Sequence, residues 1–99
     1  MRLTPSQTEA IRRAAAEVFG EQARVWLFGS RVDDNKRGGD IDLLIYPEAA
    51  TTKDVFMHKI RFLTKLEKAL GERKIDVVIE EENDSRPIVR IAHEKGIEL

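Results

Sequence analysis

The chain has 99 residues, of which 41% are hydrophobic and 35% are charged, and its net charge is -1 at pH 7. A chain of this length builds one hydrophobic core, so we expect a single domain over residues 1–99. The near-neutral charge argues against strong non-specific binding of nucleic acid. With no cysteine, no signal peptide and no apolar run that could span a bilayer, the sequence predicts a cytoplasmic protein without membrane contact.

Helices and strands are expected to alternate along the chain, without repeats or linkers. Thr4 and Gln7 have the spacing of a capping box, and Pro5 stands at the first helical position between them. Short apolar runs bounded by glycine, proline or polar residues predict strands, and apolar residues at helical spacing predict helices. The predicted order is helix, strand, loop or short helix, strand, helix, strand, helix, over residues 5–20, 24–28, 31–39, 40–46, 52–71, 74–79 and 86–96.

Two of these helices carry apolar stripes that we expect to face the core. The stripes comprise Phe56, Ile60, Leu63, Leu66 and Leu70 in the long helix, and Ile88, Ile91 and Ala92 in the last one. Trp26 lies inside an apolar strand, which favours core packing over stacking on a base. His58 and His93 lack a second ligand at suitable spacing and are expected to pack or to lie at the surface. A solvated surface is likewise expected for Lys65, Lys68, Arg73, Lys74 and the acidic run 80–82.

Two carboxylates open the second predicted strand. Asp40 and Asp42 are two residues apart and therefore point to one face, whereas Ile41 points to the other. Crowded like charges raise the pKa of at least one carboxyl unless a cation neutralises them. Hard oxygen ligands favour Mg²⁺, which fills its remaining positions with water and phosphate oxygens, so a nucleotide is the natural third component. Asp76 adds a third carboxylate if the second and third strands are neighbours, and three carboxylates can hold two ions.

Gly29 and Ser30 follow the first predicted strand as a candidate phosphate-binding turn. Glycine permits close approach of a ligand, and backbone N–H groups and the Ser30 hydroxyl can donate to phosphate oxygens. Arg31 is placed to neutralise phosphate charge. Two aspartates at this spacing equally fit residues that cap a turn, but Asp76 inside an apolar strand has no turn to cap. The combination favours a metal–nucleotide site for phosphoryl or nucleotidyl transfer.

These motifs resemble the signature of the polymerase β-like nucleotidyltransferase superfamily. The matching stretches are Phe28-Gly29-Ser30-Arg31, Gly39-Asp40-Ile41-Asp42-Leu43 and Ile75-Asp76-Val77. The short chain resembles in particular the minimal nucleotidyltransferases, the MNT antitoxins paired with HEPN-domain toxins. The resemblance implies an α+β fold, a small mixed sheet flanked by helices. It also implies metal ligands at Asp40, Asp42 and Asp76, and nucleotide contacts at Gly29, Ser30, Arg31 and Gly39.

The same resemblance implies transfer of AMP from ATP, with two Mg²⁺ ions, to a hydroxyl of the HEPN toxin, typically of a tyrosine. Asp76 would complete the site or act as general base. The chain departs from the family at Asp33 and Asp34 in the loop, and at Gly39, where serine is common. Two other functions stay open: an antitoxin that neutralises a HEPN partner by binding alone, and a nucleotidyltransferase for RNA or a small molecule. Because the chain has little room for an acceptor-binding domain, we expect oligomerisation or a complex with the HEPN partner.

Overall fold

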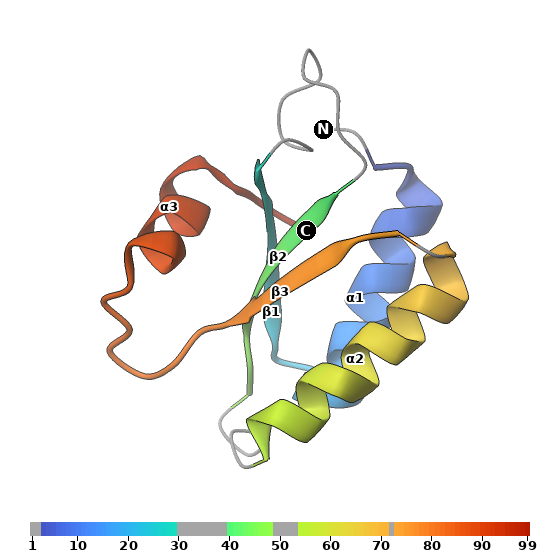
Figure 1. Ribbon diagram of the computed structural model, residues 1–99, viewed down its shortest axis with the longest axis horizontal. Coiled ribbons are helices and arrows are strands. Elements are labelled where there is room, and N and C mark those ends of the chain that lie inside the picture. Colours follow the sequence, from blue (N-terminus) through green and yellow to red (C-terminus); the bar gives the residue numbers. More distant parts are fainter. Residues whose placement is uncertain (1–2, 30–39, 49–53, 72) are drawn as a thin grey trace.

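The computed structural model of the chain describes residues 3–29, 40–48, 54–71 and 73–99. In this part the elements follow the order α1, β1, β2, α2, β3, α3, β4 (Figure 1). The helices span Pro5–Phe19, Val55–Leu70 and Pro87–Lys95, and the strands span Arg24–Phe28, Ile41–Tyr46, Ile75–Ile79 and Ile97–Glu98. Every predicted helix and strand is confirmed except at 31–39, which lies outside the described residues, and β4 was not predicted. None of the helices described is long and apolar enough to cross a bilayer.

The four strands form one mixed sheet in the order β3-β2-β1-β4, which confirms the predicted α+β fold. β1 is antiparallel to both of its neighbours, and β2 is parallel to β3. The register places Phe28 opposite Asp42, and Asp42 opposite Asp76. One row of side chains therefore crosses three adjacent strands at the end of the sheet where β1 finishes and β2 begins.

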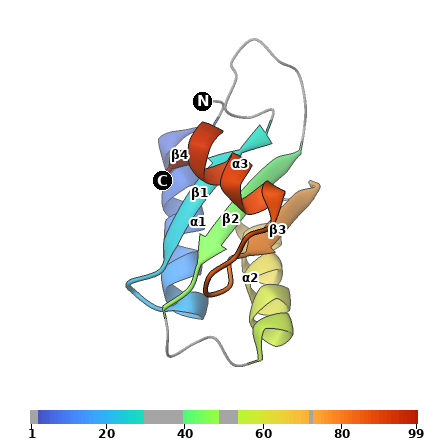
Figure 2. The same ribbon diagram turned by 90° about the vertical axis from the view of Figure 1, so that its left-hand side faces the viewer.

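One face of the sheet, here called the closed face, is covered by α1 and α2 (Figure 2). Its strand side chains are buried against the helices and comprise Val25, Leu27, Ile41, Leu43, Ile45, Val77 and Ile79. Phe62 of α2 packs edge-on against Phe19 of α1, with 5.4 Å between the ring centroids. Lys65 and Glu17 join the same two helices by an ion pair of 2.9 Å.

The opposite side, here called the open face, is covered only in part, by α3 (Figure 2). Val89 and Ala92 of this helix pack on the strand side chains Trp26, Phe28 and Leu44. Since side chains alternate along a strand, Asp42 shares the open face with Leu44, and Asp76 shares it with Val78. The apolar cover thus ends where these carboxylates begin.

The predicted apolar stripes of α2 and α3 were wrong in part. Phe56 and Ile60 are 72% and 41% exposed, and Phe62 and Leu66 are the α2 residues with 0% exposure. In α3 the buried residues are Val89 and Ala92, whereas Ile88 and Ile91 are 40% and 45% exposed. Both helices carry apolar residues on more than one side, so helical spacing alone did not determine which stripe faces the sheet.

The other core and capping predictions agree with the structure. Trp26 is 7% exposed and is part of the core. The capping box is confirmed: the Gln7 N–H donates to Thr4 Oγ1 at 3.1 Å, and the Thr4 N–H donates to Gln7 Oε1 at 2.9 Å. Leu66 is buried as expected, and Leu63 and Leu70 are half-buried against the closed-face core.

Candidate functional site

The three predicted aspartates lie together at one end of the open face. Asp42 and Asp76 are each the second residue of their strand, and the parallel pairing of β2 with β3 sets them side by side. Asp40 immediately precedes β2 and is half-buried like Asp42, whereas Asp76 is exposed. The condition under which Asp76 could join the pair, that β2 and β3 are neighbours, is therefore met.

The charge of Asp42 is unfavourably placed in the absence of a cation. Burial raises the pKa of this carboxyl above its ordinary value, and the negative charges of Asp76 and Asp40 raise it further. A hydrogen bond between the Asp42 and Asp76 side chains acts in the same direction, whereas Lys74 opposes it. Like charges crowded in this way are relieved by a bound cation, so the donor set fits a divalent metal ion.

The carboxylates form an open site rather than a closed cage. Within residues 3–29, 40–48, 54–71 and 73–99, no three acidic or histidine side chains come close enough together to enclose a metal ion by themselves. Mg²⁺ is commonly bound in this way, by one or two carboxylates with water and substrate phosphates at its other positions. The arrangement thus fits an ion that arrives with a nucleotide better than a permanently held structural ion.

Gly29 lies directly beside the carboxylate of Asp42. It follows Phe28, the residue paired with Asp42, and has a φ of 78°. A Cβ added at Gly29 would overlap Asp42 Oδ2, which a real side chain could not do without displacing the carboxylate. The close approach of this carboxylate therefore requires glycine here, whereas the predicted approach of a phosphate ligand to Gly29 stays a prediction. Ser30, Arg31 and Gly39 lie outside the described residues.

Lys74 is exposed to solvent, as the sequence predicted, but it also lies beside Asp40, and sequence analysis missed this contact. Its Nζ lies 3.8 Å from Asp40 Oδ2. Its backbone carbonyl accepts a hydrogen bond of 3.0 Å from the Ile41 N–H, which fixes the start of β3 against the start of β2. The signal that could have found it is its spacing, because a residue two before Asp76 points to the same side of an extended chain.

Trp26 and His93 lie in a separate group of aromatic and charged side chains on the open face. Trp26 packs edge-on with His93 at 4.4 Å between centroids and lies under the Arg24 guanidinium at 4.8 Å. His93 Nε2 is 2.6 Å from Glu80 Oε1, and Arg24 makes two hydrogen bonds to Glu98, at 2.7 and 2.8 Å. These contacts confirm the packing interpretation of Trp26 and His93. A separate cavity of about 380 Å³ lies between α1 and the N-terminal end of β1, away from the aspartates.

Comparison with known proteins gives a family match over most of the chain. A family profile described as "Polymerase beta, Nucleotidyltransferase" matches residues 13–99. The matched range includes all four strands and the three aspartates. No protein of curated function matches the chain significantly.

Proposed function

The chain belongs to the polymerase β-type nucleotidyltransferase family, and from this premise we propose that it transfers AMP from ATP to a hydroxyl of a HEPN-domain protein, as an antitoxin. One observation carries the proposal: Gly29, Asp42 and Asp76 meet at one end of three adjacent strands. Gly29, the candidate start of a phosphate-binding turn, thus lies beside paired carboxylates on a part of the open face that helix α3 leaves uncovered. Positioning and charge stabilisation are the main needs of such a transfer.

Asp40, Asp42 and Asp76 are the residues that would hold Mg²⁺. Burial, and then the nearby charges of Asp76 and Asp40, raise the pKa of Asp42, as expected at a site that gains from a cation. When bound, Mg²⁺ neutralises the triphosphate and stabilises charge on the phosphoryl oxygens. The proposal includes two ions, which Asp40, Asp42 and Asp76 would hold together with the triphosphate.

The transfer step exchanges one phosphorus–oxygen bond for another. The acceptor oxygen forms a bond to the α-phosphorus, while the bond to the oxygen bridging the α- and β-phosphorus breaks and pyrophosphate leaves with the electron pair. The acceptor proton goes to the carboxylate of Asp76, which is exposed and so accessible to a hydroxyl presented by another molecule. Because Gly29 has no side chain, the Asp42 carboxylate can keep its position beside the end of β1.

A protein acceptor suits this chain better than RNA. The net charge of -1 gives no positive field to attract a polyphosphate backbone. The site is also exposed at the end of the sheet, where a hydroxyl carried by a partner surface can approach Asp76. The choice of a HEPN-domain partner, and of tyrosine as the acceptor, rests on the resemblance to the minimal nucleotidyltransferases.

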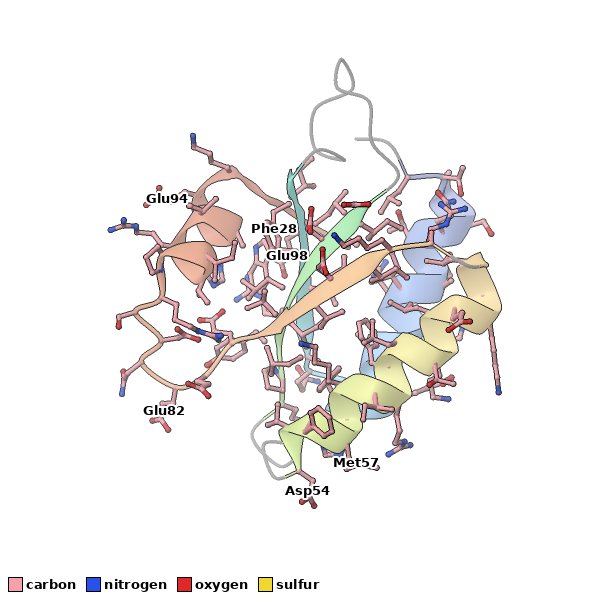
Figure 3. All side chains as sticks on the ribbon, viewed as in Figure 1. Phe28, Asp54, Met57, Glu82, Glu94 and Glu98 are labelled. Atoms are coloured by element: carbon pink, nitrogen blue, oxygen red, sulfur yellow. The ribbon has the colours of Figure 1, made fainter. Side chains whose placement is uncertain are left out.

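Intact-mass measurement of a HEPN-domain protein encoded beside this chain tests the proposal. After incubation with the chain, ATP and Mg²⁺, we expect the partner to gain one or more AMP units. Asp42→Asn should abolish the gain. Asp54→Asn is the matched control, because Asp54 makes no capping hydrogen bond and lies at the start of α2, which follows the other end of β2 (Figure 3).

The same experiment separates catalysis from simple binding. A partner that is silenced in a stable complex but gains no mass would contradict the transfer and favour a binding antitoxin. Turnover of ATP with RNA or a small alcohol in the absence of a HEPN protein would instead identify that molecule as the acceptor.

A further inference from the structure

Four charged side chains form a two-by-two array at the start of β2 and β3. The parallel register pairs Ile41 with Ile75 and Asp42 with Asp76. One step earlier, the same register brings Asp40 beside Lys74, in agreement with the 3.8 Å between Asp40 Oδ2 and Lys74 Nζ. Three corners of the array are therefore carboxylates and the fourth is an ammonium group.

The contact between Lys74 and Asp40 is loose. The distance of 3.8 Å is too long for a hydrogen bond, and the two side chains are 67% and 50% exposed. Exposed ion pairs of this kind contribute little to stability. The backbone of Lys74 is nevertheless fixed, because its carbonyl accepts the Ile41 N–H at 3.0 Å. A flexible four-carbon stem on a fixed backbone keeps the ammonium within reach of the site and free to change partner.

We infer that Lys74 exchanges partners when substrate binds: it balances Asp40 in the empty site and binds a phosphate oxygen of the nucleoside triphosphate in the loaded one. The inference rests on the proposed nucleotidyl transfer. It identifies Lys74 as a residue that determines specificity in that reaction. The Lys74 ammonium lies where the Asp40 carboxylate would attract a cation, so it competes with a metal ion that binds without nucleotide. It carries three donors, so it assists a metal ion that arrives with a triphosphate.

Lys74→Met separates competition with a free metal ion from binding of the triphosphate. The substitution should strengthen binding of the free metal ion and weaken binding of the triphosphate. Mn²⁺ added without nucleotide, with free Mn²⁺ measured by electron paramagnetic resonance, should bind about 3-fold to 10-fold more tightly to Lys74→Met, because a competing charge is gone. ATP in the presence of Mg²⁺ should bind about 10-fold more weakly, because one charge-assisted contact is lost. AMP, which lacks the β- and γ-phosphates, should bind within about 2-fold of the wild type.

Two further variants serve as controls. Lys74→Arg keeps the positive charge and should stay close to the wild type for both Mn²⁺ and ATP. Lys68→Met makes the same chemical change in the last turn of α2, on the closed side of the sheet, and should change neither affinity. Since the Lys74 side chain is exposed and its backbone bond does not depend on the side chain, the methionine variant should fold, which a thermal melt would verify.

The outcomes distinguish this inference from the proposed function. If the wild type binds Mn²⁺ and ATP, and Lys74→Met changes neither, the inference is overturned and the proposed function stands. If Lys74→Met weakens Mn²⁺, ATP and AMP alike, Lys74 merely supports Asp40 and the inference is again overturned. If the wild type binds neither Mn²⁺ nor ATP, the proposed function fails and the inference fails with it.

Discussion

The closed and open faces of the sheet are made by the same strands, yet they differ in what fills them. On the closed face Leu27, Leu43 and Ile45 are 0% exposed under two helices. On the open face the same strands carry Trp26 and Leu44 under α3, and then Asp42 beyond its cover. Because side chains alternate along a strand, one strand can contribute to the core through one residue and to a polar site through the next.

Substitutions on the two faces should therefore affect different quantities. Removal of a closed-face side chain should lower the free energy of unfolding, because it leaves a cavity between the sheet and two helices. Removal of a charge at the uncovered end of the open face should lower the rate of transfer with little effect on stability. The predictions that follow test this division.

The largest effect is expected for Asp42→Asn on the open face. The rate of AMP transfer should fall about 1,000-fold, because a metal ion stabilises the transition state by several kcal/mol and this variant weakens its binding. The free energy of unfolding should not fall, since the variant removes a partly buried charge that lies beside the charges of Asp76 and Asp40. Transfer rates and urea unfolding, with Asp54→Asn as control, test both parts. A loss of stability that parallels the loss of rate would show that the carboxylate is needed for folding.

Phe62→Ala tests the closed face. Phe62 is 0% exposed and packs against Phe19, so its truncation should cost about 3–5 kcal/mol of the free energy of unfolding. Phe56→Ala makes the same change in the same helix at a side chain that is 72% exposed, and should stay within about 0.5 kcal/mol of the wild type. Urea denaturation of the two variants is a direct comparison. Equal losses would mean that Phe56 is covered in solution.

Gly29→Ala should affect both the free energy of unfolding and the rate of transfer. Gly29 and Gly71 have φ values of 78° and 82°, so alanine at either position should cost about 1–3 kcal/mol in backbone strain. At Gly71 the added Cβ meets nothing within 4 Å, whereas at Gly29 it meets Asp42 Oδ2. Only Gly29→Ala should therefore reduce transfer by the folded protein, by about 100-fold, the typical cost of a displaced catalytic group. Similar transfer rates for the two alanine variants would argue against a role for Asp42 geometry.

The sequence was sufficient to predict the helices and three of the four strands because their main signals are local, whereas the mixed sheet was implied by the family resemblance. The Thr4 capping box and the apolar runs of β1, β2 and β3 are visible in single stretches of chain. The two-residue strand β4 has no such signal, since it exists only by pairing Ile97 with Leu27 of β1. The prediction of the buried side of α2 was partly wrong for a related reason. Phe62 and Phe56 are equally apolar, and only packing in the folded protein determines that Phe62 is buried and Phe56 is exposed.

Spacing within one strand predicts only part of the site, and the inclusion of Asp76 also depended on the family resemblance. That Asp40 and Asp42 point to one face follows from the two-residue period of a strand. That Asp76 lies beside Asp42 depends on the strand order, and that Lys74 lies beside Asp40 depends on the register as well. Neither the strand order nor the register is encoded in any single stretch, which is why the contact of Lys74 with Asp40 was not predicted.

The smallest effect concerns the connection that holds α3 over the open face. Asp84 accepts hydrogen bonds from the Glu81 N–H at 3.0 Å and the Arg86 N–H at 3.1 Å, and it pairs with the Arg86 guanidinium at 2.6 Å. Arg86 also donates to the Ile79 carbonyl at 2.7 Å, at the end of β3. The Asp84 side chain is 1% exposed. Asp84→Asn should loosen this connection and lower the free energy of unfolding by less than Phe62→Ala does.

The pH dependence of stability identifies the Asp84 contribution. Hydrogen bonding to Arg86, and then to the Glu81 N–H, holds the pKa of Asp84 well below its ordinary value of 3.8. The unfolded chain therefore takes up a proton at Asp84 at a higher pH than the folded protein does. Stability from this carboxylate is fully present above its ordinary pKa and is lost as the pH falls below it.

Urea unfolding followed by the fluorescence of Trp26, the only tryptophan, measures that loss between neutral pH and about pH 3. The wild type should lose more free energy of unfolding over this interval than Asp84→Asn. Glu82→Gln, a change at an exposed side chain in the same connection, should follow the wild type (Figure 3). Parallel pH profiles for the wild type and Asp84→Asn would show that the Asp84 contacts do not hold α3 over the open face. The cover of that face would then depend on the remaining contacts of α3, which are the apolar packing of Val89 and Ala92 and the contacts of His93 with Trp26 and Glu80.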